Sequence, residues 1–263
     1  MARDVRALRP PKPAPNPVRI ERLSDDDVAS VKSLLIHEDK AILAFNKPSG
    51  LAVQGGSGVH KSLEYFLQAF AKSNGKRPHL VHRLDIHTSG VIVVARTKPA
   101  AAALSKAFAE RDAHKTYLAI VSGGAPDPCE GEIALRLKKI QRNGQDVMKI
   151  VPEGGQDALT LYKTLAANDH AALLELHPKT GRMHQLRAHL AAIGRPIAGD
   201  VKYAGAKQIA GLSMPRLALH AAKLDVPHPD GGRILLEAPP PEAFALALRS
   251  LSLEPTPAQN SAK

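Results

Sequence analysis

One carboxylate in this chain stands among basic residues in a way that could support chemistry. Asp85 follows Arg83 and Leu84 within the stretch HLVHRLDIHTSG (79–90), and the apolar run VIVVA (91–95) comes directly after it. A buried acid is seldom without partners, because an uncompensated charge in a dry environment is costly. Such an acid stays ionised only where cations or hydrogen-bond donors compensate it. An ionised, partly dry carboxylate can act as a nucleophile, so Asp85 is the first candidate catalytic residue.

A second basic stretch, HPKTGRMHQLRAHLAAIGRPIAGD (177–200), supplies candidate partners for this acid. If residues 183–193 form a helix, Arg187 shares one face with His184, while Leu190 belongs to another, apolar face. The apolar face would then pack on a sheet, and the opposite face would present Arg187 to a cleft. An isolated basic helix start is more often a solvated surface, so this stretch alone leaves both interpretations open.

A third block, HKTYLAIVSG (114–123), places Tyr117 in an otherwise aliphatic strand. A lone tyrosine in a strand more often packs in a core or at an edge than takes part in catalysis. A second acid, Asp200, ends the basic stretch in the dipeptide Gly-Asp, and we interpret it as a turn residue.

Motifs for phosphate, metal or cofactor binding fail when their spacing is checked. GGSGVHKS (55–62) resembles a phosphate-binding loop, but His60 stands where the Walker pattern requires Gly. The histidine pairs His82/His87 and His184/His189 are five residues apart, which does not place two ligands on one helix face, and no HExxH or Cys pair occurs. No GxSxG or GxGxxG pattern follows a strand. We therefore expect neither a metal nor an organic cofactor.

Composition narrows the class of protein. The chain has 263 residues and a net charge of +11, which favours a polyanionic partner, most simply nucleic acid, although an unrelated basic enzyme could carry the same charge. Aromatic residues are 3% of the chain and Trp is absent, which argues against a platform of stacked bases. The single cysteine, Cys129, excludes an intrachain disulfide and fits a cytoplasmic setting. No apolar run is long enough for a membrane span, and no secretory signal is visible.

The elements that must position these residues lie in an expected catalytic domain, residues 37–251. Strands outnumber helices and often follow one another, which predicts an α+β fold with a central mixed, mostly antiparallel sheet, flanking helices and an active-site cleft. Residues 1–36 are predicted to be a Pro-rich basic linker and a short helix that begins after Ser24, and residues 252–263 a flexible tail. The predicted strands are 41–46, 91–96, 115–122, 131–138, 147–151, 158–165, 171–177, 216–226 and 233–238, with a hairpin turn at PDGG (229–232), and the predicted helices are 61–73, 99–111 and 183–193.

Taken in order, the blocks HRLDIHTSGVIVVA, KTYLAIV and TGRMHQLRAHLAAIGRPIAGD resemble the RluA-type pseudouridine synthase family. NKPSGLAVQGGSG (46–58) is similar too, and the resemblance spans about 40–240. The loop QGGSG and the segment VPEGGQDALTLYKTL (151–165) look most like the RluC subgroup, which modifies large-subunit 23S rRNA. Members of that subgroup usually carry a small S4-type RNA-binding domain before the catalytic domain. Only the Pro-rich basic segment precedes residue 24 here, so we expect that domain to be absent from this chain.

The resemblance implies a cofactor-free isomerase that converts uridine in RNA to pseudouridine and that we expect to be a cytoplasmic monomer. It implies that Asp85 is the essential catalytic group, that Arg187 pairs with it, and that Tyr117 stacks on the flipped uracil. It also implies that Arg83 helps to displace the target base, since flipping a base costs a few kcal/mol. The remaining residues expected to bind substrate are His82, Thr88, Arg182, His184 and Leu219.

Three alternatives remain open at this point. The substrate could be tRNA, alone or together with rRNA. The chain could be a non-catalytic RNA-binding factor built on the same fold. It could also be an aspartate-based glycosidase, although that class often needs a second acid. The sequence leaves open whether Asp85 attacks the sugar, attacks the base or assists elimination, and which uridines are modified.

Overall fold

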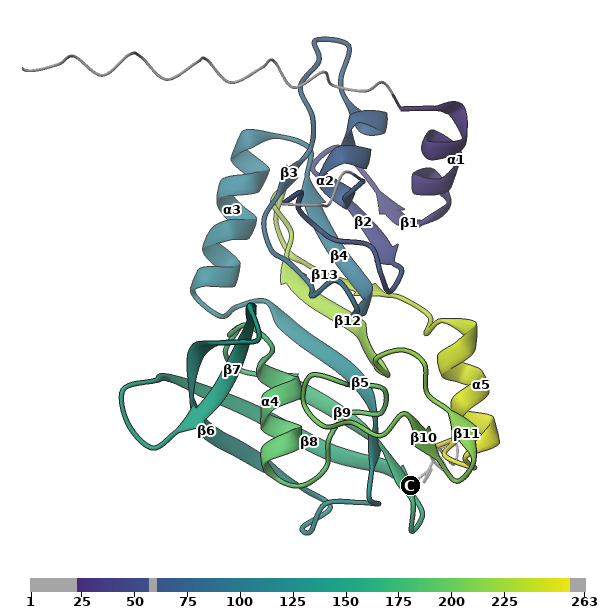
Figure 1. The fold of residues 1–263 in the computed structure, drawn as a ribbon. Coiled ribbons are helices and arrows are strands. Elements are labelled where there is room, and N and C mark those ends of the chain that lie inside the picture. Colours follow the sequence, from purple (N-terminus) through teal and green to yellow (C-terminus); the bar gives the residue numbers. More distant parts are fainter. Residues whose placement is uncertain (1–22, 57–60, 256–263) are drawn as a thin grey trace, which may run out of the picture.

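The computed structural model describes residues 23–56 and 61–255, and these fold around one large sheet (Figure 1). Segment 1–22 of the predicted linker, loop residues 57–60 and the end of the predicted tail lie outside the described residues. The helices are α1 (Asp25–Ser33), α2 (Leu63–Phe66), η1, a 3-10 helix (Leu67–Phe70), α3 (Lys98–Ala109), α4 (Gln185–Ala192) and α5 (Glu242–Ser250). The strands are β1 (Leu35–Glu38), β2 (Ile42–Lys47), β3 (His79–Leu80), β4 (Ser89–Ala95), β5 (His114–Ser122), β6 (Glu130–Arg142), β7 (Gln145–Val151), β8 (Gln156–Ala167), β9 (Ala171–Pro178), β10 (Gln208–Ile209), β11 (Leu212–Ser213), β12 (Leu219–Pro227) and β13 (Arg233–Glu237).

The eleven-stranded sheet runs in the order β1-β2-β4-β12-β5-β9-β8-β6-β7, with β3 beside β4 and β13 beside β12. Its pairings within the described residues are antiparallel except that of β4 with β12, where Ser89 pairs with His220 and Gly90 with Ala221. At this junction the backbones approach so closely that a Cβ on Gly90 would lie 2.1 Å from the Ala221 carbonyl oxygen. The predicted α+β fold with a mixed, mostly antiparallel sheet is confirmed.

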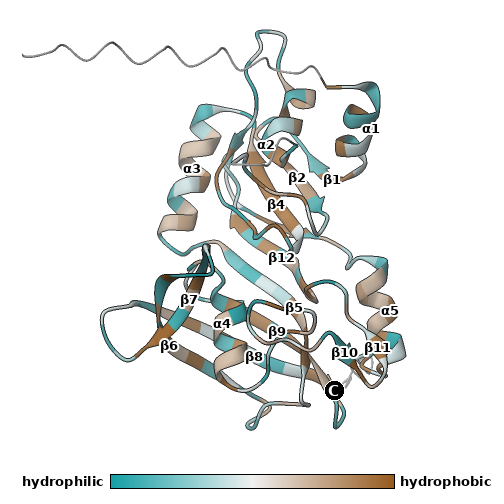
Figure 2. Ribbon diagram, in the orientation of Figure 1, coloured by the Kyte–Doolittle hydropathy of each residue, from teal (hydrophilic) through white to brown (hydrophobic). Residues whose placement is uncertain are grey.

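Strand β4 is buried along its whole length because helices cover both faces of the sheet around it (Figure 2). Alternate residues of a strand point to opposite faces. Val91 and Val93 accordingly pack with Leu104 of α3, whereas Ile92 and Val94 pack with Leu63 of α2, Leu67 of η1 and Val31 of α1. The strand that follows Asp85 is therefore held from both sides.

The other half of the sheet carries α4 on its face (Figure 1). Leu186 and Leu190 of α4 lie in the same core as Leu174 of β9. The predicted apolar face of residues 183–193 does pack on the sheet, and it leaves Arg187 on the side that faces Asp85.

Most predicted elements are present, with a few differences. Ser24 caps α1 through a reciprocal bond with Asp27, and the PDGG turn joins β12 and β13 as predicted. Strands β1 and β3, the small hairpin β10–β11 and helix α5 were not predicted, and the predicted helix 61–73 is shorter, namely α2 followed by the 3-10 helix η1. Leu253, inside the segment predicted as a flexible tail, is 0% exposed in the core, so packing continues beyond residue 251. Within the described ranges, no helix combines the length and apolar character needed to cross a membrane.

Candidate active site

Asp85 lies in the loop 81–88, between the short strand β3 and the buried strand β4. The loop turns at this point because the backbone N–H of Thr88 donates to the Asp85 carbonyl at 3.0 Å. Thr88 itself is buried, whereas the Asp85 side chain keeps 21% of its surface exposed. The acid singled out by the sequence is therefore half-buried, fixed by its loop and still accessible to a ligand.

The Arg187 guanidinium lies between two carboxylates. Its Nε and Nη2 donate to Asp200 at 2.7 Å each, and its Nη1 lies 3.7 Å from Asp85 Oδ2. Burial acts to lower the pKa of Arg187, but the hydrogen bonds and charge of Asp200, together with the charge of Asp85, outweigh it and raise that pKa. The structure thus brings Arg187 beside Asp85 as predicted, although its closer partner is Asp200.

Asp200 has a larger part in the site than the sequence analysis allowed. Its Oδ1 accepts the backbone N–H groups of Lys202 and Tyr203 at 3.1 and 3.3 Å, so the turn interpretation is correct. The side chain is also 0% exposed, and its two short bonds to Arg187 form a buried bidentate pair, the strongest class of charged hydrogen bond. Interpreting Asp200 as turn chemistry alone was therefore wrong, because both of its oxygens also hold the cation of the site.

Lys47 ties the loop of Asp85 to the turn that follows β2. Its side chain is 0% exposed, and its Nζ donates to the carbonyls of Pro48, Leu51 and Ile86 at 3.0, 2.8 and 3.2 Å. Three carbonyls match the three hydrogens of the ammonium group. Burial lowers the pKa of Lys47 to about 8, while the charge of Asp85 opposes the decrease. A second buried cation thus supports the loop that carries Asp85.

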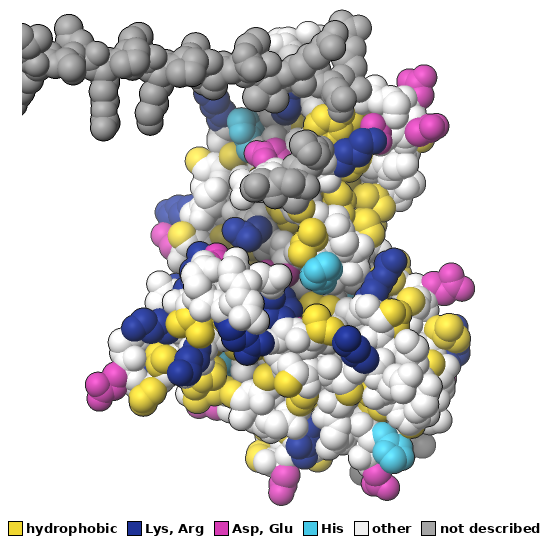
Figure 3. All heavy atoms as spheres, viewed as in Figure 1, with side chains coloured by type: hydrophobic (Ala, Val, Ile, Leu, Met, Phe, Trp, Pro, Cys, Tyr) yellow, Lys and Arg dark blue, Asp and Glu magenta, His cyan; other side chains and the backbone are white. Residues whose placement is uncertain are grey.

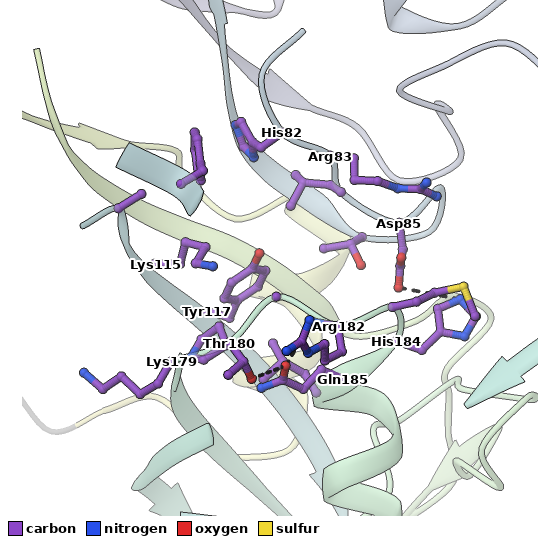
Figure 4. A pocket seen from close by; sticks show the side chains of 18 of the residues that line it. His82, Arg83, Asp85, Lys115, Tyr117, Lys179, Thr180, Arg182, His184 and Gln185 are labelled. Atoms are coloured by element: carbon purple, nitrogen blue, oxygen red, sulfur yellow. Dashed lines mark hydrogen bonds and ion pairs between the residues drawn. The ribbon is translucent and has the colours of Figure 1, made fainter. Parts of the chain in front are cut away.

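His184 stands immediately before α4 in a left-handed backbone conformation, with φ 49° and ψ 23°. Its Nε2 lies 3.8 Å from Asp85 Oδ2, and its Nδ1 lies 3.0 Å from the Tyr203 hydroxyl. Burial lowers the pKa of His184 to about 4, against the charge of Asp85 and with the help of Arg187 and Lys202. The ring is therefore neutral at neutral pH, and it faces Asp85 (Figure 4).

A cavity of about 970 Å³ opens in front of Asp85. This volume lies at the upper end of the range for small-molecule sites, about 300–1,000 Å³. Tyr117 projects into the cavity from β5 (Figure 4), and burial together with the charge of Asp85 raises the pKa of its phenol, which stays protonated at neutral pH. The wall also contains all the other residues that the sequence predicted to bind substrate: His82, Arg83, Thr88, Arg182, His184 and Leu219.

Two of these residues already use part of their bonding capacity on the protein itself. His82 Nε2 accepts the backbone N–H of Val93 at 3.0 Å, and its ring stacks on Phe108 with centroids 4.4 Å apart. Arg182 Nε donates to the Asp157 carbonyl at 3.3 Å. Both side chains line the cavity, but His82 presents a ring that β4 and α3 hold in place.

A second cavity of about 530 Å³ adjoins Asp85. Arg83, Leu84, Asp85, His184 and Arg187 line both cavities, so the carboxylate stands where the two hollows meet. An extended ligand could therefore occupy both hollows and pass directly over Asp85.

Cationic side chains surround the first cavity, and Figure 3 shows Lys and Arg gathered across the middle of this face. Lys115 shares a strand face with Tyr117 and is half-buried, and burial lowers its pKa. Within residues 23–56 and 61–255, no hydrogen bond or ion pair holds its ammonium group. The same residues contain no cluster of three or more His, Cys, Asp and Glu side chains placed to hold a metal ion. The further cations of this wall are Arg83, Arg111, Lys179, Arg182 and Arg187.

The mixed sheet, and the acid beside an arginine over a basic cavity, agree with the resemblance to pseudouridine synthases noted in the sequence. The model of the RNA pseudouridylate synthase family matches residues 41–192, a range that contains Asp85, Tyr117 and Arg187. The chain belongs to this family of RNA-modifying isomerases.

Individual relatives agree with that assignment. Ribosomal large subunit pseudouridine synthase C of Yersinia pestis is 38% identical over 81% of this chain and 68% of its own length. The mitochondrial pseudouridylate synthase RPUSD4 of Xenopus tropicalis is 35% identical over 86% of this chain and 82% of its own length. Among solved structures, Human RNA Pseudouridylate Synthase Domain Containing 4 covers 88% of this chain and 99% of its own with a TM-score of 0.74 at 30% identity. The family, the fold and the enzyme class predicted from the sequence are confirmed.

Proposed function

We propose that this enzyme isomerises uridines of large-subunit ribosomal RNA and that Asp85 is its catalytic carboxylate. The observation that carries the proposal is the position of Asp85. It is half-buried where two cavities meet, with Arg187 Nη1 3.7 Å away and a fully buried lysine, Lys47, behind its loop. Two cations thus lie near a carboxylate that is still open to substrate.

The reaction leaves the composition of the nucleotide unchanged. The bond between N1 of uracil and C1′ of ribose breaks, the base turns, and C5 bonds to C1′. The proton on C5 is lost and N1 ends protonated, so no oxidant, reductant or group donor is required. Asp85 is suited to stabilise or trap the electron-poor C1′ while the base turns, because its charge is held in a partly dry site.

The other residues of the first cavity receive supporting roles in this proposal. Tyr117 provides the ring on which the flipped uracil stacks, and its protonated phenol makes it a donor in the resting enzyme. Arg83 lines both cavities and is suited to fill the gap that the flipped base leaves in the RNA. Leu219 packs under the base, and Thr88 and Arg182 complete the wall.

Charge supports RNA as the partner. The net charge of +11 and the cations around the first cavity neutralise phosphates and release their counterions. Relatives named for large-subunit rRNA favour that substrate over tRNA. We further propose that the enzyme is a monomer that acts in the cytoplasm, where assembling ribosomes are found.

The test incubates the protein with C5-tritiated transcripts of large-subunit rRNA and of total tRNA, using Asp85→Asn as the control. Tritium release and pseudouridine from rRNA alone support the proposal in full. Release from tRNA alone overturns the rRNA assignment but not the chemistry. Free uracil in place of pseudouridine would identify a glycosidase, and binding without turnover would identify a non-catalytic RNA-binding factor. Turnover by Asp85→Asn above about one per cent of wild type would remove Asp85 from its role.

A further inference from the structure

The hydroxyl of Tyr203 is bonded on two sides. It accepts the backbone N–H of Met148 at 2.7 Å, which occupies an oxygen lone pair and leaves the hydroxyl hydrogen to be placed. The second partner is Nδ1 of His184, at 3.0 Å. If Tyr203 donates to Nδ1, then the Met148 N–H, the Tyr203 hydroxyl and the His184 nitrogen each have a hydrogen-bond partner. If Nδ1 donated instead, the hydroxyl hydrogen would have no acceptor within the described residues.

This bonding pattern decides where the imidazole proton lies. A neutral imidazole carries its hydrogen on one ring nitrogen, and the bond made by the other nitrogen selects which. Burial lowers the pKa of His184 to about 4, so the ring is neutral at neutral pH and the choice of tautomer matters. With Nδ1 accepting from Tyr203, the hydrogen lies on Nε2.

That Nε2–H points at the reactive carboxylate. Nε2 of His184 lies 3.8 Å from Asp85 Oδ2, and Arg187 Nη1 lies 3.7 Å from the same oxygen. Within the described residues, no side chain forms an ion pair or hydrogen bond with Oδ1 of Asp85. The two carboxylate oxygens are therefore different: the Arg187 cation and the neutral His184 N–H face Oδ2, and Oδ1 is left for the substrate.

The backbone of His184 supports a special role for this residue. A left-handed conformation is unfavourable for residues other than glycine and tends to persist at functional sites that the surrounding structure over-determines. Helix capping does not explain it, because the His184 side chain makes no capping bond to α4. Its ring is instead held edge-on against the Tyr203 ring, with an interplanar angle of 87°.

We propose that Tyr203 is a positioning residue that holds His184 in its Nε2–H tautomer, and that this N–H stabilises Oδ2 of ionised Asp85 so that Oδ1 is the reacting oxygen. The proposal rests on the proposed role of Asp85. His184 and Arg187 would both move closer to Oδ2 of Asp85 when substrate fills the cavity, since catalytic hydrogen bonds are often long in the free enzyme.

Side chains that imitate each ring nitrogen can test the proposal. The amide nitrogen of Gln reaches the place of Nε2, whereas that of Asn reaches the place of Nδ1. His184→Gln should therefore keep more activity than His184→Asn. Stability should rank in the opposite order, because Asn tolerates the left-handed conformation better than Gln. A purely structural role for His184 would make Asn the better replacement on both measures.

The tautomer itself is measured by ¹⁵N NMR on the full-length protein labelled at histidine, with His184→Gln used to assign the signal. The wild type should show a protonated Nε2 and a bare Nδ1, and Tyr203→Phe should lose that preference. Single-turnover rates of Tyr203→Phe should fall about tenfold while the Kd for RNA changes less than about twofold. The ring of Tyr203, which lies 5.1 Å from the Arg187 guanidinium carbon, is kept in this variant.

A protonated Nδ1 in the wild-type protein would overturn the proposal, as would His184→Asn exceeding His184→Gln in activity. The NMR result does not depend on turnover. If the wild type forms no pseudouridine, the proposed function fails while the tautomer is still decided. If it forms pseudouridine and the tautomer is wrong, only this inference fails.

Discussion

Arg187 lies between the carboxylates of Asp200 and Asp85, and we expect the first to contribute mainly to stability and the second mainly to turnover. Asp200→Asn keeps an oxygen for the backbone N–H of Lys202 but removes the charge from a side chain that is 0% exposed. Removing one partner of a buried pair costs about 3–5 kcal/mol, because the remaining charge stays buried without compensation. Asp85, 3.7 Å from the same guanidinium, compensates in part, so the expected loss in free energy of unfolding is about 3 kcal/mol.

Asp85→Asn examines the same cation from the other side. The Asp85 carboxylate is 21% exposed and 3.7 Å from Arg187, which is beyond hydrogen-bond distance, and Asp200 still neutralises the guanidinium. The loss in free energy of unfolding should therefore stay below about 1 kcal/mol, as for a partly exposed ion pair. Pseudouridine formation should nevertheless disappear. One acid thus acts mainly on stability and the other mainly on turnover.

Urea denaturation of the wild type and both variants at pH 7 measures the difference. A change of midpoint at constant slope reports stability alone. The reasoning is refuted if Asp200→Asn loses less than about 1 kcal/mol, or if Asp85→Asn loses as much as Asp200→Asn. Either outcome would mean that the bidentate pair does not hold Arg187 in place.

The remaining predictions concern charge, pH and metal. Arg187→Ala leaves Asp200 buried without its cation, so the free energy of unfolding should fall by about 3–5 kcal/mol. Its single-turnover rate should also fall, because Asp85 loses a cation 3.7 Å from its Oδ2. Arg187→Lys keeps a cation and should lose less stability and less activity, and wild-type turnover by the Ala variant would contradict the pairing. His189 is 0% exposed, neither ring nitrogen has a partner within the described residues, and burial lowers its pKa from 6.5 to about 4. As the pH falls from 6.5 towards 4, His189 becomes protonated in the unfolded chain but not in the folded protein, so the free energy of unfolding decreases in that window. His189→Leu should remove up to about 3 kcal/mol of this decrease, measured by urea denaturation at pH 6.5 and at pH 4. An unchanged decrease would show that His189 does not cause it. Lys115→Gln should reduce the salt slope of RNA binding by about one unit without lowering the urea midpoint, whereas an unchanged slope would mean that Lys115 meets no phosphate. Activity on a short unstructured RNA should survive EDTA, and a loss restored by one divalent ion would show that a metal takes part.

The fold was largely predictable because its strands alternate strongly and its turns carry clear signals. Val91 to Ala95 form an unbroken apolar run, and a strand buried on both faces requires such a run. Helix α5 was not predicted, although Phe244 and Ala247 form an apolar stripe. The helix directly follows three prolines, residues 239–241, so no apolar run leads into it. The cap of α5 gives no help either, since Pro241 makes no side-chain capping bond.

The candidate site was predictable only where a residue belongs to a distinctive block. Asp85, Tyr117 and Arg187 each belong to one, and the structure brings all three to one cavity. Lys47 donates to the carbonyl of a residue 39 positions away and is 0% exposed. Nothing in the local sequence distinguishes this buried lysine from one on the surface. The hydroxyl of Tyr203 is oriented by a backbone N–H 55 positions away. Such roles depend on partners distant along the chain, which local patterns do not reveal.

The parallel junction of β4 and β12 has a consequence for how the enzyme folds during its synthesis. Ser89 and His220, bonded side chain to side chain at this junction at 2.9 Å, are 131 residues apart. Closing so long a stretch of chain is entropically costly and slows folding. Strand β12 lies between β4, which follows Asp85, and β5, which carries Tyr117. The two walls of the cavity therefore meet only when β12 inserts between them. While β12 is still inside the ribosome, the nascent chain cannot assemble the cavity. We therefore expect the chain to become active only after this strand has been synthesised and has emerged.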